Sequence, residues 1–319
     1  MIQKIKLIAI AAFAGASLAA NAQMVYEANR SVADQKISLV GWGSGSVAES
    51  DDVAYEGTNS IRISSRNLFQ GGILKFGQSV DLSSQYANKA NLLMFSLNIG
   101  GQASGGDGGG RGAAGAAAGG GAVGSAGGLG APGEGGGAAG GGQTTVAAGL
   151  VKALEKVRVV ITTTDGKHAE AFLNLTTAVK DAKGWFSVGI PLQSIAGLER
   201  TNKSIASISL SGDSVATFYV GQIRIMTDNT PVFAEPNVRE LNLAFGDEVT
   251  LTASGSAGAT PVVFRWDFDS RDGITIDAEG AQVKRRFRRE GTFMVTLTAV
   301  DAYGLKQPYS TTIRVVVNP

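Results

Sequence analysis

Strict alternation of side chains near the end of the chain is the feature that most limits its possible folds. In residues 263–269 (VFRWDFD) every second side chain is aromatic, and in residues 291–301 (GTFMVTLTAVD) every second side chain from Phe293 to Ala299 is apolar. A period of two residues is that of a β-strand with one buried face. About seven short strands are predicted within residues 237–319, which is typical of a β-sandwich.

The same two motifs resemble the PKD (polycystic kidney disease) domain, whose pattern has Trp-Asp-Phe-Gly-Asp-Gly, then His-x-Tyr, then Gly-Thr-Tyr-x-Val-x-Leu-x-Val-x-Asp. The resemblance covers nearly all of residues 237–319 and implies an immunoglobulin-like sandwich. Residues 269–273 (DSRDG) replace the tight Gly-Asp-Gly turn, and Arg285 stands where the family has His. The carboxylates of residues 267–273 are spaced one residue too widely for a calcium loop, so a hydrogen-bonded turn is predicted.

Residues 284–289 (KRRFRR) form the densest basic run of the chain. Alternation along a strand would divide the run between two faces, with Phe287 marking the inward one. Such a run would attract acidic glycans, lipopolysaccharide phosphates or a partner surface. The interpretation that we favour here is a solvated strand edge that discourages pairing with other chains.

The N-terminus has the layout of a secretory signal peptide. Lys4 and Lys6 are followed by the apolar residues 7–20 and by a small-x-small cleavage site at residues 20–22 (ANA). The apolar stretch is shorter than the roughly 20 residues that a spanning helix needs. We therefore predict that residues 1–22 are removed, that the chain has no membrane span, and that it is exported to a bacterial periplasm, cell surface or medium.

Composition excludes several classes of function. The chain has no cysteine and a single histidine, His168, so a Cys/His zinc site is impossible and disulfides do not contribute. A Ser-His-Asp triad would need His168, which lies in a predicted turn. No Asp or Glu stands in a recognisable catalytic context, and a formal net charge of +1 gives no general attraction to nucleic acid. We expect a non-catalytic protein with no nucleic-acid partner.

A Gly- and Ala-rich tract at residues 100–145 interrupts the strand pattern. It cannot bury enough apolar surface to offset its backbone entropy, which predicts a disordered loop. The tract separates two predicted strands, residues 92–99 and 157–164, so we interpret it as an insertion within one domain. Silk-like self-association is the alternative. A phosphate-binding loop is not indicated, because no GK[ST] motif and no strand-to-helix junction accompany the glycines.

The remainder of residues 23–229 is a series of short strands separated by turns, which predicts a first β-sandwich. Gly221 and Gln222 interrupt the alternation of the last strand, residues 218–225, and predict a β-bulge. Residues 230–236, with two prolines, are the expected linker. The predicted fold class is all-β, with a jelly-roll sandwich followed by an immunoglobulin-like one.

Several motifs of the first domain resemble the galactose-binding-like jelly roll of non-catalytic carbohydrate-binding modules. The segments that carry the resemblance are residues 41–42 (GW), 55–63 (YEGTNSIRI), 80–86 (VDLSSQY), 93–95 (LMF), 184–192 (GWFSVGIPL) and 218–225 (FYVGQIRI). The family often has an Asp in the closing strand where Gly221 and Gln222 stand. The usual ligand-side or calcium-side contact is therefore replaced in this chain.

Sugar binding by such folds relies on exposed aromatic rings that stack on pyranose faces. The candidate rings are Trp42, Tyr55, Phe69 and Tyr86. Trp185 is predicted to lie in the core instead, because it precedes an alternating strand.

An acidic cluster offers hard oxygen ligands to a structural Ca²⁺. Its members are Glu49, Asp51 and Asp52, joined by Asp228. A solvated acidic turn is the alternative, which we favour. No other cofactor is expected.

Two functions from different classes follow. The first is a secreted, non-catalytic envelope or extracellular protein that acts as a structural or adhesive display module. The second is a carbohydrate-binding protein that recognises extracellular or cell-wall polysaccharide through the N-terminal sandwich. The expected partners are polysaccharide or other envelope proteins.

Overall fold

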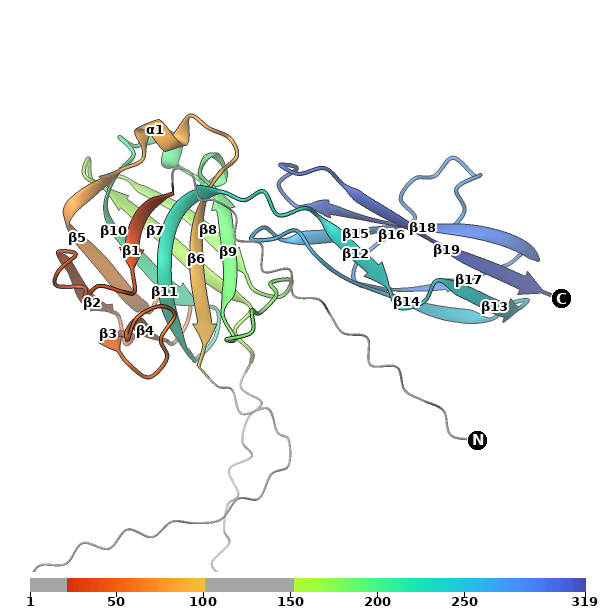
Figure 1. The fold of residues 1–319 in the computed structure, drawn as a ribbon, viewed down its shortest axis with the longest axis horizontal. Helices are drawn as coiled ribbons and strands as arrows, with labels where there is room; N and C mark the ends of the chain where they lie inside the picture. The colour runs from red at the N-terminus through yellow and green to blue at the C-terminus, as the bar shows by residue number, and fades with distance from the viewer. Residues whose placement is uncertain (1–21, 101–151) are drawn as a thin grey trace, which may run out of the picture. The chain divides into compact units, whose positions relative to one another are not determined.

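The structure is a computed structural model of the 319-residue chain, and it describes residues 22–100 and 152–319. The signal peptide predicted at residues 1–22 and the loop predicted at residues 100–145 lie outside this part, apart from their end residues. The described part is built from β-strands, with one four-residue helix, α1 (Ser83–Tyr86), and two 3-10 turns, η1 (Leu192–Ser194) and η2 (Leu198–Arg200) (Figure 1). Among these helices, none is long and apolar enough to cross a membrane.

The N-terminal sandwich consists of two antiparallel sheets. The first sheet has the order β3 (Ser46–Ser50), β4 (Ser60–Ser65), β11 (Ala216–Thr227), β6 (Asn91–Ile99) and β9 (Phe186–Pro191), and β1 (Gln23–Glu27) also pairs with β11. The second has the order β2 (Ile37–Trp42), β5 (Gly71–Asp81), β10 (Ser204–Gly212), β7 (Lys156–Thr163) and β8 (His168–Asn174).

The chain crosses repeatedly between the two sheets. The sets β4-β11-β6-β9 and β5-β10-β7-β8 each contain strands that are distant in sequence but adjacent in space. This order is that of two interlocked Greek keys, a jelly roll. The predicted fold class is therefore confirmed.

Alternation places the core between the sheets. In β7, Val157, Val159 and Ile161 are buried against residues of both sheets, whereas Arg158 and Val160 point to the outer face. Burial of the inner side chains is the main stabilising contribution, and it fixes which residues the outer face presents.

The predicted bulge is confirmed, because the register of β11 against β6 shifts between Val220 and Gln222. A carbon added to Gly221 would overlap the Cβ of Tyr55 and would crowd the ring of Trp185. Glycine at position 221 therefore permits a close approach that any larger residue would obstruct.

The C-terminal sandwich has a three-stranded and a five-stranded sheet. The first has the order β12 (Phe233–Pro236), β14 (Glu248–Ser256) and β17 (Gln282–Arg286). The second has the order β13 (Glu240–Ala244), β19 (Tyr309–Asn318), β18 (Gly291–Asp301), β15 (Val262–Asp267) and β16 (Ala278–Glu279), with β13 parallel to β19.

Trp266 of β15 is fully buried at the centre of this second core, among residues such as Val295 and Leu297. Its indole Nε1 donates a hydrogen bond of 2.9 Å to the carbonyl oxygen of Gly280. The large ring is thus buried without an unpaired donor. The aromatic alternation that predicted this strand is confirmed.

Candidate functional site

One row of side chains runs across all five strands of the second sheet of the jelly roll. Trp42, Gly71, Ser211, Arg158 and Phe172 are successive register partners on β2, β5, β10, β7 and β8. The four side chains of this row point away from the core, because they are out of phase with core residues of the same strands, such as Leu39, Leu210, Val159 and Leu173. The row spans four strand spacings, or about 19 Å. It places an aromatic ring at each end, with Gly71, Ser211 and Arg158 between them.

Arg158, the fourth residue of this row, is held in place by hydrogen bonds. Its Nε and Nη2 donate hydrogen bonds of 2.7 and 3.2 Å to the two carboxylate oxygens of Glu170, and its Nη1 donates one of 3.2 Å to the carbonyl oxygen of Leu68. A two-point contact of this kind sets both the position and the plane of the guanidinium. The side chain is only 14% exposed.

The guanidinium of Arg158 in turn positions two aromatic rings. Its Cζ lies 5.6 Å from the ring centroid of Trp42 and 4.9 Å from that of Phe69. These distances are within the range of cation–π attraction. Arg158 therefore joins two rings that are far apart in sequence into one aromatic surface.

Phe69 is held in the loop between β4 and β5. Its N–H donates a hydrogen bond of 2.8 Å to Asn67 Oδ1. The carbonyl oxygen of the preceding residue, Leu68, also accepts a hydrogen bond of 2.7 Å from the hydroxyl of Ser211. Despite this fixed backbone, Phe69 is 63% exposed, and Phe172 is 46% exposed. Large exposed rings on an ordered surface mark an interaction site. We call Trp42, Phe69, Arg158 and Phe172 the aromatic face.

Polar groups increase along the sheet away from the aromatic face. The next row along the strands consists of Val40, Ile73, Ser209, Val160 and Glu170, and the one after it of Ser38, Lys75, Ser207, Thr162 and His168. The single histidine, His168, is exposed, and its Nδ1 lies 3.0 Å from the hydroxyl oxygen of Thr162, within hydrogen-bonding distance. This part of the sheet offers hydroxyl, amine and imidazole groups next to the rings.

Glu170 remains ionised under ordinary conditions. The hydrogen bonds from Arg158 hold the pKa of its carboxyl below the usual value, against the opposing effect of partial burial, and the charge of Arg158 adds to the lowering. The ion pair therefore leaves the centre of the aromatic face without net charge.

Two of the four predicted sugar-stacking residues, Trp42 and Phe69, come together on this face. The other two lie elsewhere. Tyr55 packs edge-on against Trp185, with ring centroids 5.1 Å apart, and Tyr86 lies on α1 beneath the ammonium of Lys203. Trp185 is 2% exposed, which confirms its predicted place in the interior.

Sequence reasoning missed Arg158 and Phe172. The alternation of side chains along the strand could have identified Phe172. Its neighbours Ala171 and Leu173 face inward, so Phe172 must point outward.

The residues predicted as calcium ligands have other contacts. Glu49 accepts hydrogen bonds of 3.2 Å from the N–H of Val32 and from Asn59 Nδ2. Asp52 accepts a hydrogen bond of 3.2 Å from the hydroxyl of Tyr219, and the side chain of Asp51 is exposed. Within residues 22–100 and 152–319, no three acidic or histidine side chains form a group that could hold a metal ion.

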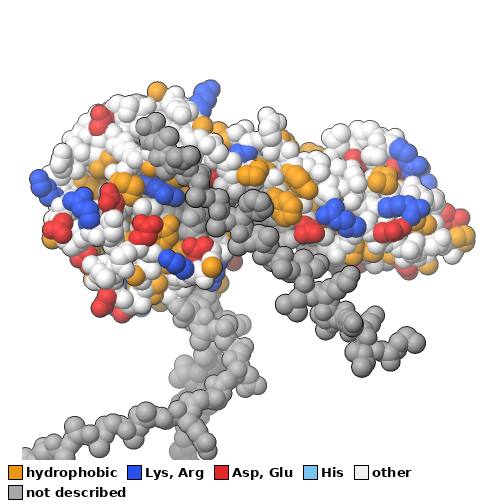
Figure 2. Space-filling view, viewed as in Figure 1, with side chains coloured by type: hydrophobic (Ala, Val, Ile, Leu, Met, Phe, Trp, Pro, Cys, Tyr) orange, Lys and Arg blue, Asp and Glu red, His pale blue; other side chains and the backbone are white. Residues whose placement is uncertain are grey.

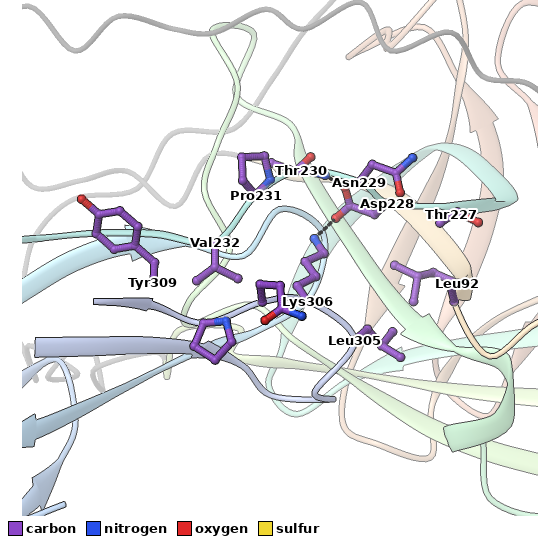
Figure 3. A pocket seen from close by; sticks show the side chains of 13 residues that line it. Leu92, Thr227, Asp228, Asn229, Thr230, Pro231, Val232, Leu305, Lys306 and Tyr309 are labelled. Atoms are coloured by element: carbon purple, nitrogen blue, oxygen red, sulfur yellow. Dashed lines mark hydrogen bonds and ion pairs between the residues drawn. The ribbon is translucent and has the colours of Figure 1, made fainter. Parts of the chain in front are cut away.

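Asp228, the fourth residue of that set, binds a lysine instead. Its Oδ2 accepts a hydrogen bond of 2.6 Å from Lys306 Nζ (Figure 3). The same oxygen accepts a hydrogen bond of 2.7 Å from the N–H of Ala259, and Oδ1 accepts one of 2.9 Å from the N–H of Thr230. Burial would raise the pKa of this carboxyl, but these hydrogen bonds outweigh burial and lower it. The ion pair lines a pocket of about 400 Å³ that also includes Pro231.

Charges elsewhere are mixed. On the surface that Figure 2 shows, basic and acidic side chains of the N-terminal sandwich are interspersed. This distribution fits the near-zero net charge and gives that surface no single sign.

The fold and the site together define a class: a protein of two β-sandwiches whose first domain presents an ordered aromatic face. The family model described as the PKD domain matches residues 230–317, which confirms the resemblance seen in the C-terminal motifs. PKD domains are typical of extracellular and surface proteins. No family model assigns the N-terminal sandwich, and a comparison with curated proteins finds no match.

Proposed function

We propose that this protein is an exported, non-catalytic carbohydrate-binding protein. Its N-terminal jelly roll recognises extracellular or cell-wall polysaccharide through the aromatic face. The observation that carries the proposal is the fixed placement of Trp42 and Phe69 around Arg158, with Phe69 largely exposed.

Sugar rings have apolar C–H faces and polar edges, so their sites combine aromatic surfaces with a few hydrogen-bonding groups. The aromatic face supplies the first, and the free lone pairs of Glu170 together with the hydroxyls of β10 and β7 supply the second. The resemblance of the N-terminal motifs to galactose-binding-like carbohydrate-binding modules supports the same function, and the PKD match supports an extracellular setting.

The electrostatics of the site indicate the kind of glycan. Because Glu170 neutralises Arg158 and occupies two of its nitrogens, the centre of the face has no free charge for an acidic sugar. We therefore propose neutral pyranose polymers as the preferred ligands of this face.

The test is retention of the mature chain on insoluble neutral glycans such as cellulose, xylan, mannan and chitin. Trp42→Ala, Phe69→Ala and Phe172→Ala should each weaken binding about tenfold, which corresponds to about 1.4 kcal/mol. Phe245→Ala is the matched control, because Phe245 is an exposed ring on the C-terminal sandwich, outside the face. Equal losses in the control and the face variants would contradict the proposal.

The other candidate is a structural or adhesive display module that binds envelope proteins. The PKD match favours it, since this domain is typical of surface proteins. Failure of the wild-type chain to bind any glycan would leave this function as the better account. Export itself is tested by fractionating cells and locating the chain in the periplasm, on the surface or in the medium.

A further inference from the structure

The basic run of the C-terminal sandwich is divided between the two faces of β17. Val283 and Phe287 are buried, and Arg285, which lies between them in the alternation, points to the same side. Lys284 and Arg286 point to the other side, where their nitrogens lie 3.6 and 3.9 Å from carboxylate oxygens of Glu248. A solvated edge accounts for that outer pair. It does not account for Arg285.

Arg285 has hydrogen-bonding capacity that the protein leaves unused. Its guanidinium carbon lies 4.8 Å from the ring centroid of Phe268, and its Nε is buried without a hydrogen-bond partner among the described residues. A buried charged donor without an acceptor is costly, and the cation–π contact offsets only part of that cost. An oxyanion in contact with the guanidinium would offset that cost.

Arg285 lies in a pocket of about 490 Å³ with further cations at its rim. Arg288 and Arg289 line the pocket, are exposed, and form no ion pair within residues 22–100 and 152–319. The walls include the rings of Phe268 and Phe293.

Two carboxylates also line the pocket, and both have local partners. Asp269 forms a 2.9 Å ion pair with Arg271, and Asp272 accepts a 2.8 Å hydrogen bond from the N–H of Ile274. Lys284 and Arg286 also contribute to the lining, but both are paired with Glu248. The three arginines Arg285, Arg288 and Arg289 therefore give the pocket a net positive charge.

We propose that this pocket is a second binding site, which takes the carboxylate or sulfate groups of an acidic polysaccharide. Guanidinium groups pair with oxyanions through two parallel hydrogen bonds, so a carboxylate or sulfate fits this pocket. Arg285 replaces the histidine of the PKD pattern, so the central cation is a feature of this chain.

The shape of the site favours a polysaccharide over a membrane. Arg285 is recessed, and only a group that enters the pocket can contact its guanidinium. Headgroups on a flat bilayer would contact the exposed Arg288 and Arg289 but would not reach Arg285. The site is independent of the aromatic face, since it involves another domain and charged ligands.

The test uses the mature chain and a matched pair of polymers, dextran sulfate and uncharged dextran, with polygalacturonate as the carboxylate probe. Affinities are measured by calorimetry at fixed ionic strength. Arg288→Ala/Arg289→Ala and Arg285→Met should each weaken binding to the two acidic polymers by about tenfold or more, the loss expected when charge-assisted contacts are removed. Dextran should not bind this site.

The control is Arg239→Ala/Arg314→Ala, which removes the same charge from the same sandwich at residues paired with Glu235 and Glu240. It should change affinity less than about twofold, because screened distant charges contribute little. Equal losses in both double variants would overturn the proposal, as would binding to phosphatidylglycerol vesicles without binding to the acidic polymers. If Arg285→Met does not fold, the exposed pair Arg288 and Arg289 still provides the test. Trp42→Ala should leave this binding unchanged, which separates the two sites.

Discussion

Lys306 Nζ lies 2.6 Å from Asp228 Oδ2, and the two side chains are 9% and 8% exposed. Asp228 lies two residues before the segment that matches the PKD domain, and Lys306 lies between β18 and β19, 78 residues further along the chain. Lys306 also donates to the carbonyl oxygen of Ala257. The entry to the C-terminal sandwich is thus fixed to two of its loops by buried charges.

Breaking this pair from one side should destabilise the C-terminal sandwich strongly. Asp228→Asn leaves the buried ammonium of Lys306 without a carboxylate, and Lys306→Met leaves the buried carboxylate of Asp228 without an ammonium. Each variant should lower the free energy of unfolding by about 3 kcal/mol. The double variant should lose clearly less than the sum of the two single losses. Urea unfolding followed by circular dichroism measures all three. Strictly additive losses would show that the two charges do not stabilise each other.

The same pair predicts a dependence on pH. The pKa of Asp228 is lower in the folded protein than its ordinary value of 3.8, because the hydrogen bonds from Lys306, Ala259 and Thr230 outweigh burial. A lowered folded pKa means that the ionised carboxylate stabilises the fold above about pH 4, and that this contribution is lost as pH falls further through the folded pKa. Melting temperatures measured from pH 6 to pH 2 should fall less steeply in Asp228→Asn. Parallel curves for both proteins would refute the assignment.

Gly221→Ala should destabilise the jelly roll. The added methyl group would overlap Tyr55 and crowd Trp185, so the backbone or both rings would have to shift, at a cost of about 1–3 kcal/mol. Ser187→Ala on β9 is a suitable control, because Ser187 is exposed on a strand of the same sheet. A melting temperature as high for Gly221→Ala as for the control would be incompatible with the close approach described above.

Glu170→Gln should change the charge preference of the aromatic face. The variant leaves Arg158 in place but removes its neutralising carboxylate, so binding should shift toward xylan that carries glucuronate and away from unsubstituted xylan. Because Glu170 is substantially exposed, the cost in stability should stay within about 1 kcal/mol. Glu279→Gln, which removes an exposed partner of Arg265, controls for net charge. An unchanged ratio of the two affinities would argue against Arg158 at the centre of the site.

Affinity for neutral oligosaccharides should increase with chain length. The row from Trp42 to Phe172 covers about 19 Å, so a ligand must be several sugar units long before it contacts both ends. Phe172→Ala should weaken the binding of long oligosaccharides and leave that of short ones on Trp42 nearly unchanged. Calorimetry on a series of increasing length provides the measurement, and a length-independent affinity would place the ligand elsewhere.

Local patterns were sufficient to predict most of the fold. The alternation of β15 and β18 identified the second sandwich, and Gly221 with Gln222 marked the bulge, because both signals depend on neighbours in sequence. The order of strands in the jelly roll followed only from resemblance, since alternation shows which side chains face inward but not which strands become neighbours.

The candidate site depended on that missing information. Trp42 and Phe69 were named as candidate rings, but Arg158 joins them only because β7 and β2 lie on the same sheet, three strand positions apart. Nothing in the neighbouring sequence distinguishes Tyr55 from these two rings, yet its ring packs edge-on against the buried Trp185. Likewise, nothing near Asp228 in the sequence indicates that Lys306 would pair with it.

The parallel pairing of β13 with β19 has a mechanical consequence. Five register pairs, from Glu240 with Arg314 to Ala244 with Asn318, join the strand near the start of the C-terminal sandwich to its last strand. Tension that pulls the two strands in opposite directions would load these evenly spaced hydrogen bonds together, in shear, whereas an antiparallel hairpin at the same place would open one bond at a time. The C-terminal sandwich therefore has a strand arrangement that resists stretching between these two strands.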